Sequence, residues 1–283
     1  MWPRSFPFGA LRFGGVALNF AATVIEDRKH EALRRCAPSG RLTSVLNPTR
    51  RKVLRAQSPS DYVKDQMRIV AIADTHLFTA DLAVPAGDVL IHAGDHARHG
   101  DLKELAEAAQ WLAKLPHPVK VAVAGNHDWG FARSPSAARK LFEEAGVTYL
   151  EDSGATVAGL RVWGSPWQPA YNDWAFNLPR GRALAERWAL IPEDLDVLIT
   201  HGPPRGIGDQ SGYGDRRAGC DDLRARVRVV RPRLHCFGHI HEAGGHWEIE
   251  GTCFVNCTTW ECERPATIID WDLASGVIKI VAP

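Results

Sequence analysis

Aspartate, asparagine and histidine residues recur in this sequence at the ends of five short apolar runs. The five groups are Asp74-Thr75-His76, Gly94-Asp95, Gly125-Asn126-His127-Asp128, His201-Gly202 and Gly238-His239-Ile240-His241. Carboxylate and amide oxygens together with imidazole nitrogens, without thiolate, are the ligands that borderline divalent metals take in proteins. The pairs Asp74/His76 and His239/His241 are two residues apart, so in extended backbone both side chains of a pair point the same way. We therefore expect each pair to hold one ion, within a metal centre that all five groups share.

Each group, taken singly, has a simpler interpretation. A carboxylate that follows a strand is more often a helix cap or a turn former, and Gly-Asn is common in turns. His239 and His241 taken alone could be ordinary core or surface histidines. The metal centre is favoured because all five groups follow apolar runs of one chain.

The elements that must position these groups are strands alternating with helices. The apolar runs predict strands at 67–73, 88–93, 119–124, 196–200 and 234–237. Amphipathic patterns predict helices at 101–115, 135–145, 180–190 and 221–230, and residues 247–281 are typical of short strands. Asp101 and Glu104 have the spacing of a capping box at the start of the first helix. The pattern predicts an α/β fold, in which the carboxyl ends of the strands meet at one ligand-binding crevice.

Charge is distributed unevenly along the chain, although the formal net charge of the 283 residues is only +1. Residues 1–66 hold 12 Lys and Arg against 5 Asp and Glu, whereas residues 67–283 hold 22 against 28. Met67 is the only methionine besides Met1. We expect a catalytic domain at 67–283 and a basic extension at 1–66, either disordered or added by a start site assigned upstream of a native start at Met67. Nucleic-acid attachment through this extension is a weaker alternative.

The composition also bears on the compartment. No apolar run reaches the roughly 20 residues that a membrane-spanning helix needs, so we do not expect an integral membrane protein. The six cysteines contain no C-x-x-C pair, as expected for reduced thiols. Residues 13–25 are a modest apolar stretch without a convincing cleavage site. We therefore expect a cytoplasmic protein.

The order D-x-H, G-D, G-N-H-D, H-G and G-H-x-H resembles the calcineurin-like metallophosphoesterases, from Arg68 to about Cys257. The segments Trp-Gly-Ser-Pro-Trp-Gln-Pro at 163–169 and Thr-His-Gly-Pro-Pro at 200–204 are similar to the subgroup of metallophosphoesterase-domain-containing proteins. The resemblance implies a four-layer α/β/β/α fold, a β-sandwich of mixed sheets flanked by helices, with two metal ions at its edge.

The resemblance also implies how the ligands divide between the two ions. One ion would be held by Asp74, His76, Asp95 and His241, and the other by Asp95, Asn126, His201 and His239, with Asp95 bridging. Mn, Fe, Zn or Co suits this ligand set. Two such cations would activate a bridging hydroxide that attacks the phosphorus atom of a phosphoester.

Further roles follow from the same resemblance and from neighbouring residues. His127 would stabilise the transition state or protonate the leaving oxygen, and Asp128 would orient His127 through a hydrogen bond. Arg98 is either part of a solvated loop or a contact to substrate phosphate. Trp129 or Trp167 is either core packing or a platform on which a base stacks.

The expected activity is therefore metal-dependent hydrolysis of a small phosphoester. A phosphodiesterase acting on a nucleotide or other small phosphodiester is favoured over a protein phosphatase. Phosphomonoesterase and a non-catalytic metal-binding scaffold are the alternatives, and the complete ligand set favours the enzyme. The sequence lacks a P-loop, a dinucleotide fingerprint and a nucleophile elbow.

Overall fold

The structure is a computed structural model that describes residues 65–212 and 217–281. The predictions about the basic extension and about a start at Met67 concern residues 1–66, which lie outside the described residues except for Asp65 and Gln66. They stay predictions.

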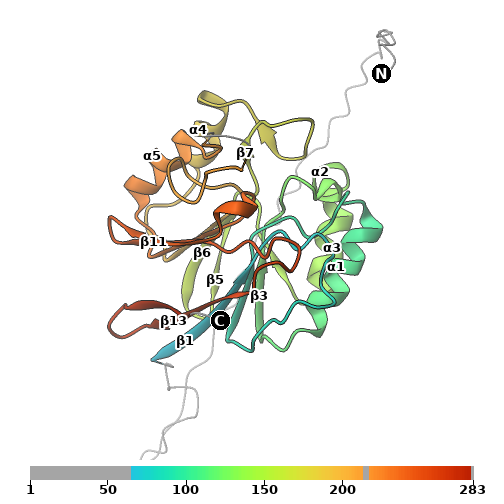
Figure 1. Cartoon of the computed structure of the whole chain (residues 1–283), viewed down its shortest axis with the longest axis horizontal. Coiled ribbons are helices and arrows are strands. Elements are labelled where there is room, and N and C mark those ends of the chain that lie inside the picture. The colour runs from blue at the N-terminus through green and yellow to red at the C-terminus, as the bar shows by residue number, and fades with distance from the viewer. Residues whose placement is uncertain (1–64, 213–216, 282–283) are drawn as a thin grey trace, which may run out of the picture. The chain divides into compact units, whose positions relative to one another are not determined.

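Two mixed six-stranded sheets form the centre of the described part of the chain (Figure 1). The first has the strand order β14-β13-β1-β2-β3-β4. Its strands are β1 (Gln66–Ile72), β2 (Val89–His92), β3 (Val119–Ala122), β4 (Thr148–Tyr149), β13 (Thr267–Asp272) and β14 (Ile278–Val281). β1, β2 and β3 are parallel neighbours, whereas β13, from the far end of the chain, pairs antiparallel with β1.

The second sheet has the order β11-β12-β10-β9-β6-β5. Its strands are β5 (Ser153–Val157), β6 (Leu160–Ser165), β9 (Val197–Thr200), β10 (Leu234–Phe237), β11 (Gly245–Ile249) and β12 (Thr252–Asn256). β6, β9, β10 and β12 are parallel, and antiparallel β5 and β11 form the edges. The short strands β7 (Gln168–Pro169) and β8 (Asn177–Leu178) pair separately.

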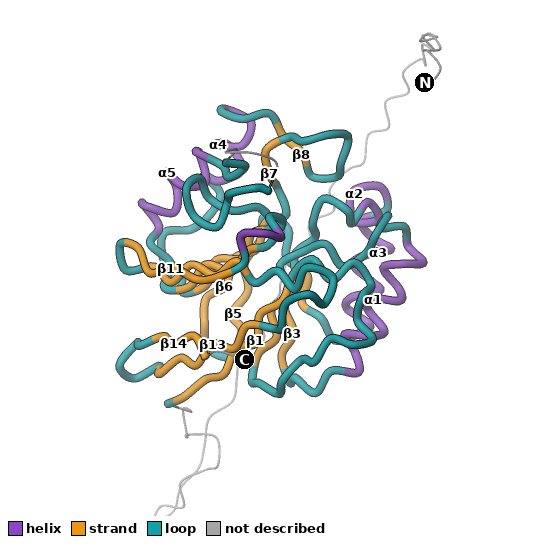
Figure 2. Tube along the Cα trace, in the orientation of Figure 1, coloured by secondary structure: helices purple, strands orange, loops and turns teal. Residues whose placement is uncertain are grey.

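Helices cover the outer face of each sheet (Figure 2). Those on the first sheet are α1 (Leu102–Lys114), α2 (Trp129–Arg133) and α3 (Pro135–Glu144). Those on the second are α4 (Arg182–Trp188) and α5 (Asp221–Val230), and a 3-10 turn, η1 (His241–Ala243), follows β10.

Three apolar layers hold these elements together. Alternation along β1 sends Ile69 into the layer between the two sheets, where it joins Ile199 of β9. The next residue along, Val70, faces the helices and packs in one cluster with Leu105 and Phe142. On the far side, residues of the second sheet form a third cluster with residues of α4 and α5. The predicted α/β/β/α layering is thereby confirmed.

The five predicted strands and four predicted helices all form, with ends that differ by at most a few residues from those expected. The β5–β6 hairpin was not predicted, because β5 is a half-exposed edge strand that contains Gly154 and lacks a continuous apolar run. Within residues 65–212 and 217–281, no helix is both long and apolar enough to cross a bilayer. The five cysteines of this region are free, and the compartment stays a prediction.

Candidate metal centre

The first sheet delivers polar side chains from three adjacent parallel strands. Asp74 and His76 follow β1, Asp95 follows β2 and Asn126 follows β3. Because β1, β2 and β3 run in the same direction, their carboxyl ends lie at one edge of the sheet. All four side chains are buried.

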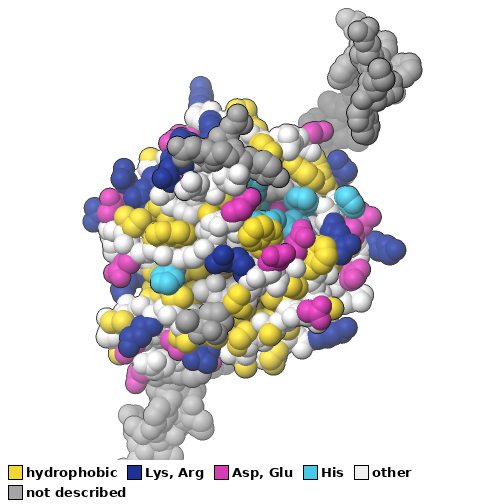
Figure 3. Space-filling model, in the orientation of Figure 1, with side chains coloured by type: hydrophobic (Ala, Val, Ile, Leu, Met, Phe, Trp, Pro, Cys, Tyr) yellow, Lys and Arg dark blue, Asp and Glu magenta, His cyan; other side chains and the backbone are white. Residues whose placement is uncertain are grey.

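The second sheet delivers three histidines to the same place. His201 follows β9, while His239 and His241 follow β10, its parallel neighbour. Figure 3 shows histidine side chains grouped beside acidic ones near the middle of the face in view. The predicted crevice therefore lies where the carboxyl ends of two sheets meet, rather than at the edge of one.

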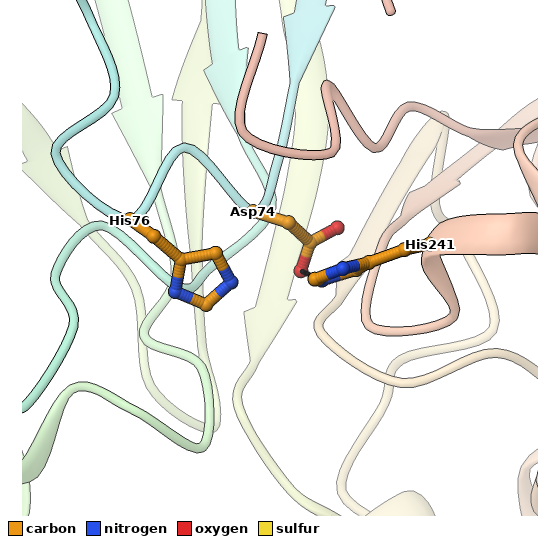
Figure 4. A group of neighbouring side chains, drawn as sticks. All are labelled: Asp74, His76 and His241. Carbon is orange, nitrogen blue, oxygen red and sulfur yellow. Dashed lines mark ion pairs between the residues drawn. The ribbon is translucent and has the colours of Figure 1, made fainter. Parts of the chain in front are cut away.

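Six of the seven predicted ligands fall into two groups of three, and the seventh, Asn126, adjoins His201 of the second group. Ligand atoms of Asp74, His76 and His241 lie within 4.8 Å of one another (Figure 4), as do those of Asp95, His201 and His239. Oδ2 of Asp95 lies 3.4 Å from Nε2 of His201 and 3.7 Å from Nε2 of His76. Asp95 therefore stands between the two groups, where a bridging ligand is expected.

The spacing argument for His239 and His241 is wrong, because these residues belong to different groups. His241 lies in the 3-10 turn η1, with Nε2 3.7 Å from Oδ1 of Asp74, whereas His239 joins Asp95. The backbone is not extended here, since the φ angle of His239 is 69°. Asp74, His76 and Asp95 also have positive φ, of 55°, 43° and 57°. Such strained backbone is typical of functional sites that the surrounding fold holds in place.

Backbone carbonyls orient two of the imidazoles. Nδ1 of His76 donates to the carbonyl of Ala97 at 3.1 Å, and Nδ1 of His201 donates to that of Ala93 at 2.9 Å. Each ring thereby directs Nε2 into the site, and Nε2 of His76 is buried without a hydrogen-bond partner. Carbonyl-anchored imidazoles with an inward nitrogen are the usual arrangement around protein-bound metals. These residues fit a divalent cation.

The atoms around His201 also call for a cation. Its Nε2 lies 2.9 Å from the amide oxygen of Asn126 and 3.4 Å from the carboxylate of Asp95, so three electron-rich atoms face one another. Burial lowers the pKa of His201, but the carboxylates of Asp95 and Asp74 and the Ala93 carbonyl together outweigh burial and raise the pKa to about 9. Burial likewise raises the pKa of Asp95, yet His201 holds it well below its usual value. Without a metal, a proton on His201 occupies the position that a cation suits.

Two glycines make room for the carboxylates. A Cβ atom on Gly238 would lie 2.5 Å from Oδ2 of Asp74, and a Cβ atom on Gly125 would overlap Oδ1 of Asp95. The carboxylate of Asp74 accepts hydrogen bonds from the backbone N–H of His239, with N–O distances of 3.0 and 3.1 Å. The glycines that begin these two sequence groups are therefore needed so that the backbone can lie close to the carboxylates, beyond any role in turns.

Comparison with known proteins agrees with this geometry. Residues 67–243 match the family model described as Calcineurin-like phosphoesterase. The chain belongs to the calcineurin-like phosphoesterase family. It is 42% identical over 229 residues to human "Metallophosphoesterase domain-containing protein 1", and the alignment covers 72% of this chain and 70% of that protein. A UPF0046 protein of Caenorhabditis elegans is 37% identical over 235 residues, covering 78% of this chain and 79% of its own length.

Solved structures share the fold of this calcineurin-like phosphoesterase at low sequence identity. One crystal structure matches with a TM-score of 0.59 and 18% identity, covering 76% of this chain and 98% of its own. TT1561 of Thermus thermophilus matches with a TM-score of 0.51 and 15% identity, with the same coverage. These two matches support the architecture alone.

His127 is a half-buried residue beside His76 and Asp95 of the candidate metal centre. Its Nδ1 donates to the carbonyl of Arg98 at 2.6 Å, so Nε2 is the nitrogen that remains for a substrate. A ligand atom of its ring lies within 4.8 Å of those of His76 and Asp95. The indole of Trp174 stacks on the imidazole, with ring centroids 4.1 Å apart and an interplanar angle of 30°.

The prediction that Asp128 orients His127 by a hydrogen bond is wrong. The buried Asp128 carboxylate accepts hydrogen bonds from the backbone N–H groups of His96, Ala97 and Gly125, at distances from 2.8 to 3.3 Å. Burial and the charge of Asp95 raise the pKa of Asp128 to about 7. Asp128 therefore holds the backbone around the site, and a carbonyl rather than a carboxylate orients His127.

The residues predicted to contact substrate have other partners in the structure. Nε of Arg98 donates to the carbonyl of His76 at 3.1 Å, and its guanidinium lies 4.3 Å from the ring centroid of Phe78. The indole of Trp129 lies under the guanidinium of Arg133 and packs on the apolar cluster beneath α1 and α3.

Trp167 is likewise part of the scaffold, since its indole N–H donates to Asp152 at 2.8 Å and Arg187 covers its ring. The structure thus gives both indoles packing contacts. The base-stacking role predicted for Trp129 or Trp167 receives no support from this geometry.

Other aromatic side chains do lie at the site. A cavity of about 520 Å³ adjoins His239 and His241, and Tyr171 and Trp260 are among its lining residues. The Trp260 ring centroid is 6.2 Å from that of His241. Trp260 lies almost 190 residues after Asp74 in the chain, and nothing in its local sequence indicated that it would face the site.

Proposed function

We propose that this calcineurin-like phosphoesterase hydrolyses a phosphodiester of a nucleotide or another small alcohol, with two divalent cations that share Asp95. The observation that carries the proposal is the position of Asp95, whose Oδ2 lies 3.4 Å from His201 and 3.7 Å from His76. One cation would be held by Asp74, His76, Asp95 and His241, and the other by Asp95, Asn126, His201 and His239. Bound cations of the Mn, Fe, Zn or Co type would supply Lewis acidity toward the phosphoryl oxygens and an attacking water.

The chain itself supplies the acid. Since the Nδ1–H of His127 is engaged by the Arg98 carbonyl, Nε2 is the atom that can carry a proton to the leaving oxygen. Trp174 covers one face of the ring and His76 meets it edge-on, at centroid distances of 4.1 and 4.6 Å. These contacts hold the imidazole in one orientation, as a general acid requires.

The cavity beside His239 and His241 supports an organic group larger than phosphate. Its volume of about 520 Å³ is within the range of small-molecule sites, and Tyr171 and Trp260 give it aromatic surface. Tyr171 is 61% exposed, so its ring is accessible to a ligand. An aromatic base is therefore a suitable occupant.

Charge in this cavity favours a monoanionic diester over a dianionic monoester. Arg180 donates to the carbonyls of Gly219 and Ala218, and Arg217 donates to Asp209. These guanidinium groups are already engaged, and the carboxylate of Glu242 adds negative charge to the cavity wall. Beyond the two cations, the cavity wall would therefore offer little further compensation for the second negative charge of a monoester.

Metal analysis with a substrate panel tests the proposal. The panel holds a phosphomonoester, a linear phosphodiester and a cyclic nucleotide, each assayed with the wild type and with Asp95→Ala. We expect metal in the wild type, diester hydrolysis, and a loss of at least about 100-fold in Asp95→Ala. Asp81→Ala, which removes an exposed carboxylate, is the matched control and should retain activity.

Three outcomes would contradict the proposal. Equal activity of the wild type and Asp95→Ala would refute the shared-carboxylate mechanism. Preference for the monoester would favour a phosphomonoesterase, and metal binding without hydrolysis of any ester would favour a scaffold. His127→Ala should lower kcat while metal content is retained; if the metal is lost as well, the role of His127 is structural.

A further inference from the structure

The loop between β2 and α1, residues 93–100, provides the carbonyls that orient three imidazoles of the site. In each case the Nδ1–H of the ring donates the hydrogen bond. His201 donates to the carbonyl of Ala93 at 2.9 Å, His76 to that of Ala97 at 3.1 Å, and His127 to that of Arg98 at 2.6 Å. The direction of Nε2 in each ring therefore depends on the conformation of this one loop.

Two carboxylates bind five consecutive backbone N–H groups of the same loop. Asp128 accepts from His96 and Ala97, and one oxygen of Glu104 accepts from Arg98, His99 and Gly100. The distances to Oε2 of Glu104 are 3.1, 2.7 and 2.9 Å. Three amides converging on one charged oxygen make a tight, charge-assisted anchor.

We propose that Glu104 is a positioning residue for the general acid: its carboxylate fixes the 98–100 turn and thereby aims Nε2 of His127 at the leaving oxygen. The inference rests on the proposed function of His127. Glu104 does not touch the site, and its influence passes through one peptide unit: the His99 N–H binds Glu104, and the carbonyl of the same peptide group, that of Arg98, accepts from His127.

Contacts other than those with Glu104 also restrict the 98–100 turn. Gly100 has a φ of 65°, and a Cβ atom there would lie 2.6 Å from Cα of Asp128. The turn therefore packs directly on the backbone that carries His127. On its other side, Arg98 Nε binds the His76 carbonyl, so the loop joins the segment of His127 to that of His76. A shift of the turn would move the Arg98 carbonyl away from Nδ1 of His127.

Kinetics of two Glu104 variants test the proposal. We expect Glu104→Gln, which keeps one acceptor oxygen but no charge, to lower kcat about tenfold, the loss expected for a charge-assisted hydrogen bond. Glu104→Ala should lower kcat about 100-fold, as a misplacement of about 1 Å does. KM and metal content should stay near wild-type values. Glu107→Gln, an exposed carboxylate on the same helix, is the control and should behave as wild type.

Two further kinetic readouts separate positioning from general damage. The loss in Glu104→Ala should be larger for an alkyl diester, whose leaving oxygen needs a proton, than for a p-nitrophenyl diester, whose leaving oxygen does not. In a His127→Ala background, Glu104→Ala should cause little additional loss, because both changes remove the same function. Equal losses for both esters, or additive losses in the double variant, would overturn the proposal.

The tautomer of His127 gives a readout that does not depend on activity. In the metal-free protein, ¹⁵N spectra of the neutral imidazole should show the Nδ1–H form in the wild type, because Nδ1 donates to the Arg98 carbonyl. Glu104→Ala should shift His127 toward a mixture of both tautomers, while Glu107→Gln should not. An unchanged spectrum in Glu104→Ala would overturn the role of Glu104. If His127→Ala keeps full activity, or the wild type hydrolyses no ester, the proposed function fails instead, and the spectra still decide on Glu104.

Discussion

His235 makes the stability of the protein sensitive to acid in a way that can be calculated. The residue is fully buried in β10 and contacts Thr200, which precedes the candidate ligand His201. The hydroxyl of Thr200 donates to the carbonyl of Gly202 at 2.8 Å, so its oxygen must accept from the Nε2–H of His235, also at 2.8 Å. Nδ1 of His235 is buried without a partner. Burial lowers the pKa of His235 to about 3, because protonation would place an unpaired charged N–H in the core.

The magnitude follows from proton linkage. The unfolded chain protonates this histidine with a pKa of about 6.5, so below that value it binds more protons than the folded chain does. The contribution of neutral His235 is therefore fully present above about pH 6.5 and is lost as the pH falls toward 3. At pH 5 the solution is about 1.5 pH units below the unfolded pKa. At about 1.4 kcal/mol per unit, His235 alone lowers the free energy of unfolding by about 2 kcal/mol relative to pH 8.

Urea unfolding of metal-free protein at pH 8 and pH 5 measures this difference. We expect His235→Gln, which keeps a donor for Thr200 but does not titrate, to lose about 2 kcal/mol less than the wild type between the two pH values. The control is His246→Gln, which removes an exposed histidine of β11 and should leave the wild-type pH dependence unchanged. If the wild type and His235→Gln lose the same stability, His235 is not the acid-sensitive group and the reasoning fails.

Two further predictions concern the metal centre. Gly125→Ala should lower metal content and activity at least about tenfold. The added Cβ atom would overlap Oδ1 of Asp95 and lie 2.7 Å from Cε1 of His201. Full metal occupancy of this variant by elemental analysis would contradict the prediction. The affinity of the metal-free protein for Zn²⁺ should rise about tenfold from pH 7 to pH 8, because the metal displaces a proton from His201, whose pKa is about 9. Competition against a chelator at the two pH values measures the change, and an affinity that does not vary with pH would refute the displacement.

The sequence predicted which polar residues lie together at the candidate centre because each of them closely follows a strand. An apolar run followed by Asp, Asn or His is a local pattern, and the parallel pairing of β1, β2 and β3 brings three such ends together. The sequence did not show which of the candidate ligands lie in the same group. The grouping depends on backbone angles such as the φ of 69° at His239, which residue types do not reveal. Extended geometry was therefore the wrong assumption for His239 and His241.

Side-chain partners were predicted least well, because they depend on contacts between distant segments. Asp128 follows His127 in sequence, yet its carboxylate binds amides of His96 and Ala97 in the loop after β2. The prediction of a capping box at Asp101 and Glu104 was half correct. Asp101 accepts from the Glu104 backbone N–H at 2.9 Å, as expected, but the Glu104 carboxylate turns to the amides of the 98–100 turn. Local spacing identified the residues but not the partners of their side chains.

The division of the ligands between the two sheets has a mechanical consequence. Asp74 comes from the first sheet and His241 from the second, and the backbone N–H of His239 already bonds to Asp74 across 165 residues of sequence. A cation bound between them would close a very long loop of chain, as a disulfide does, and would bind the folded chain only. Metal loading would then stabilise the contact between the two sheets in addition to the apolar layer that they share, and chelation would remove that contribution.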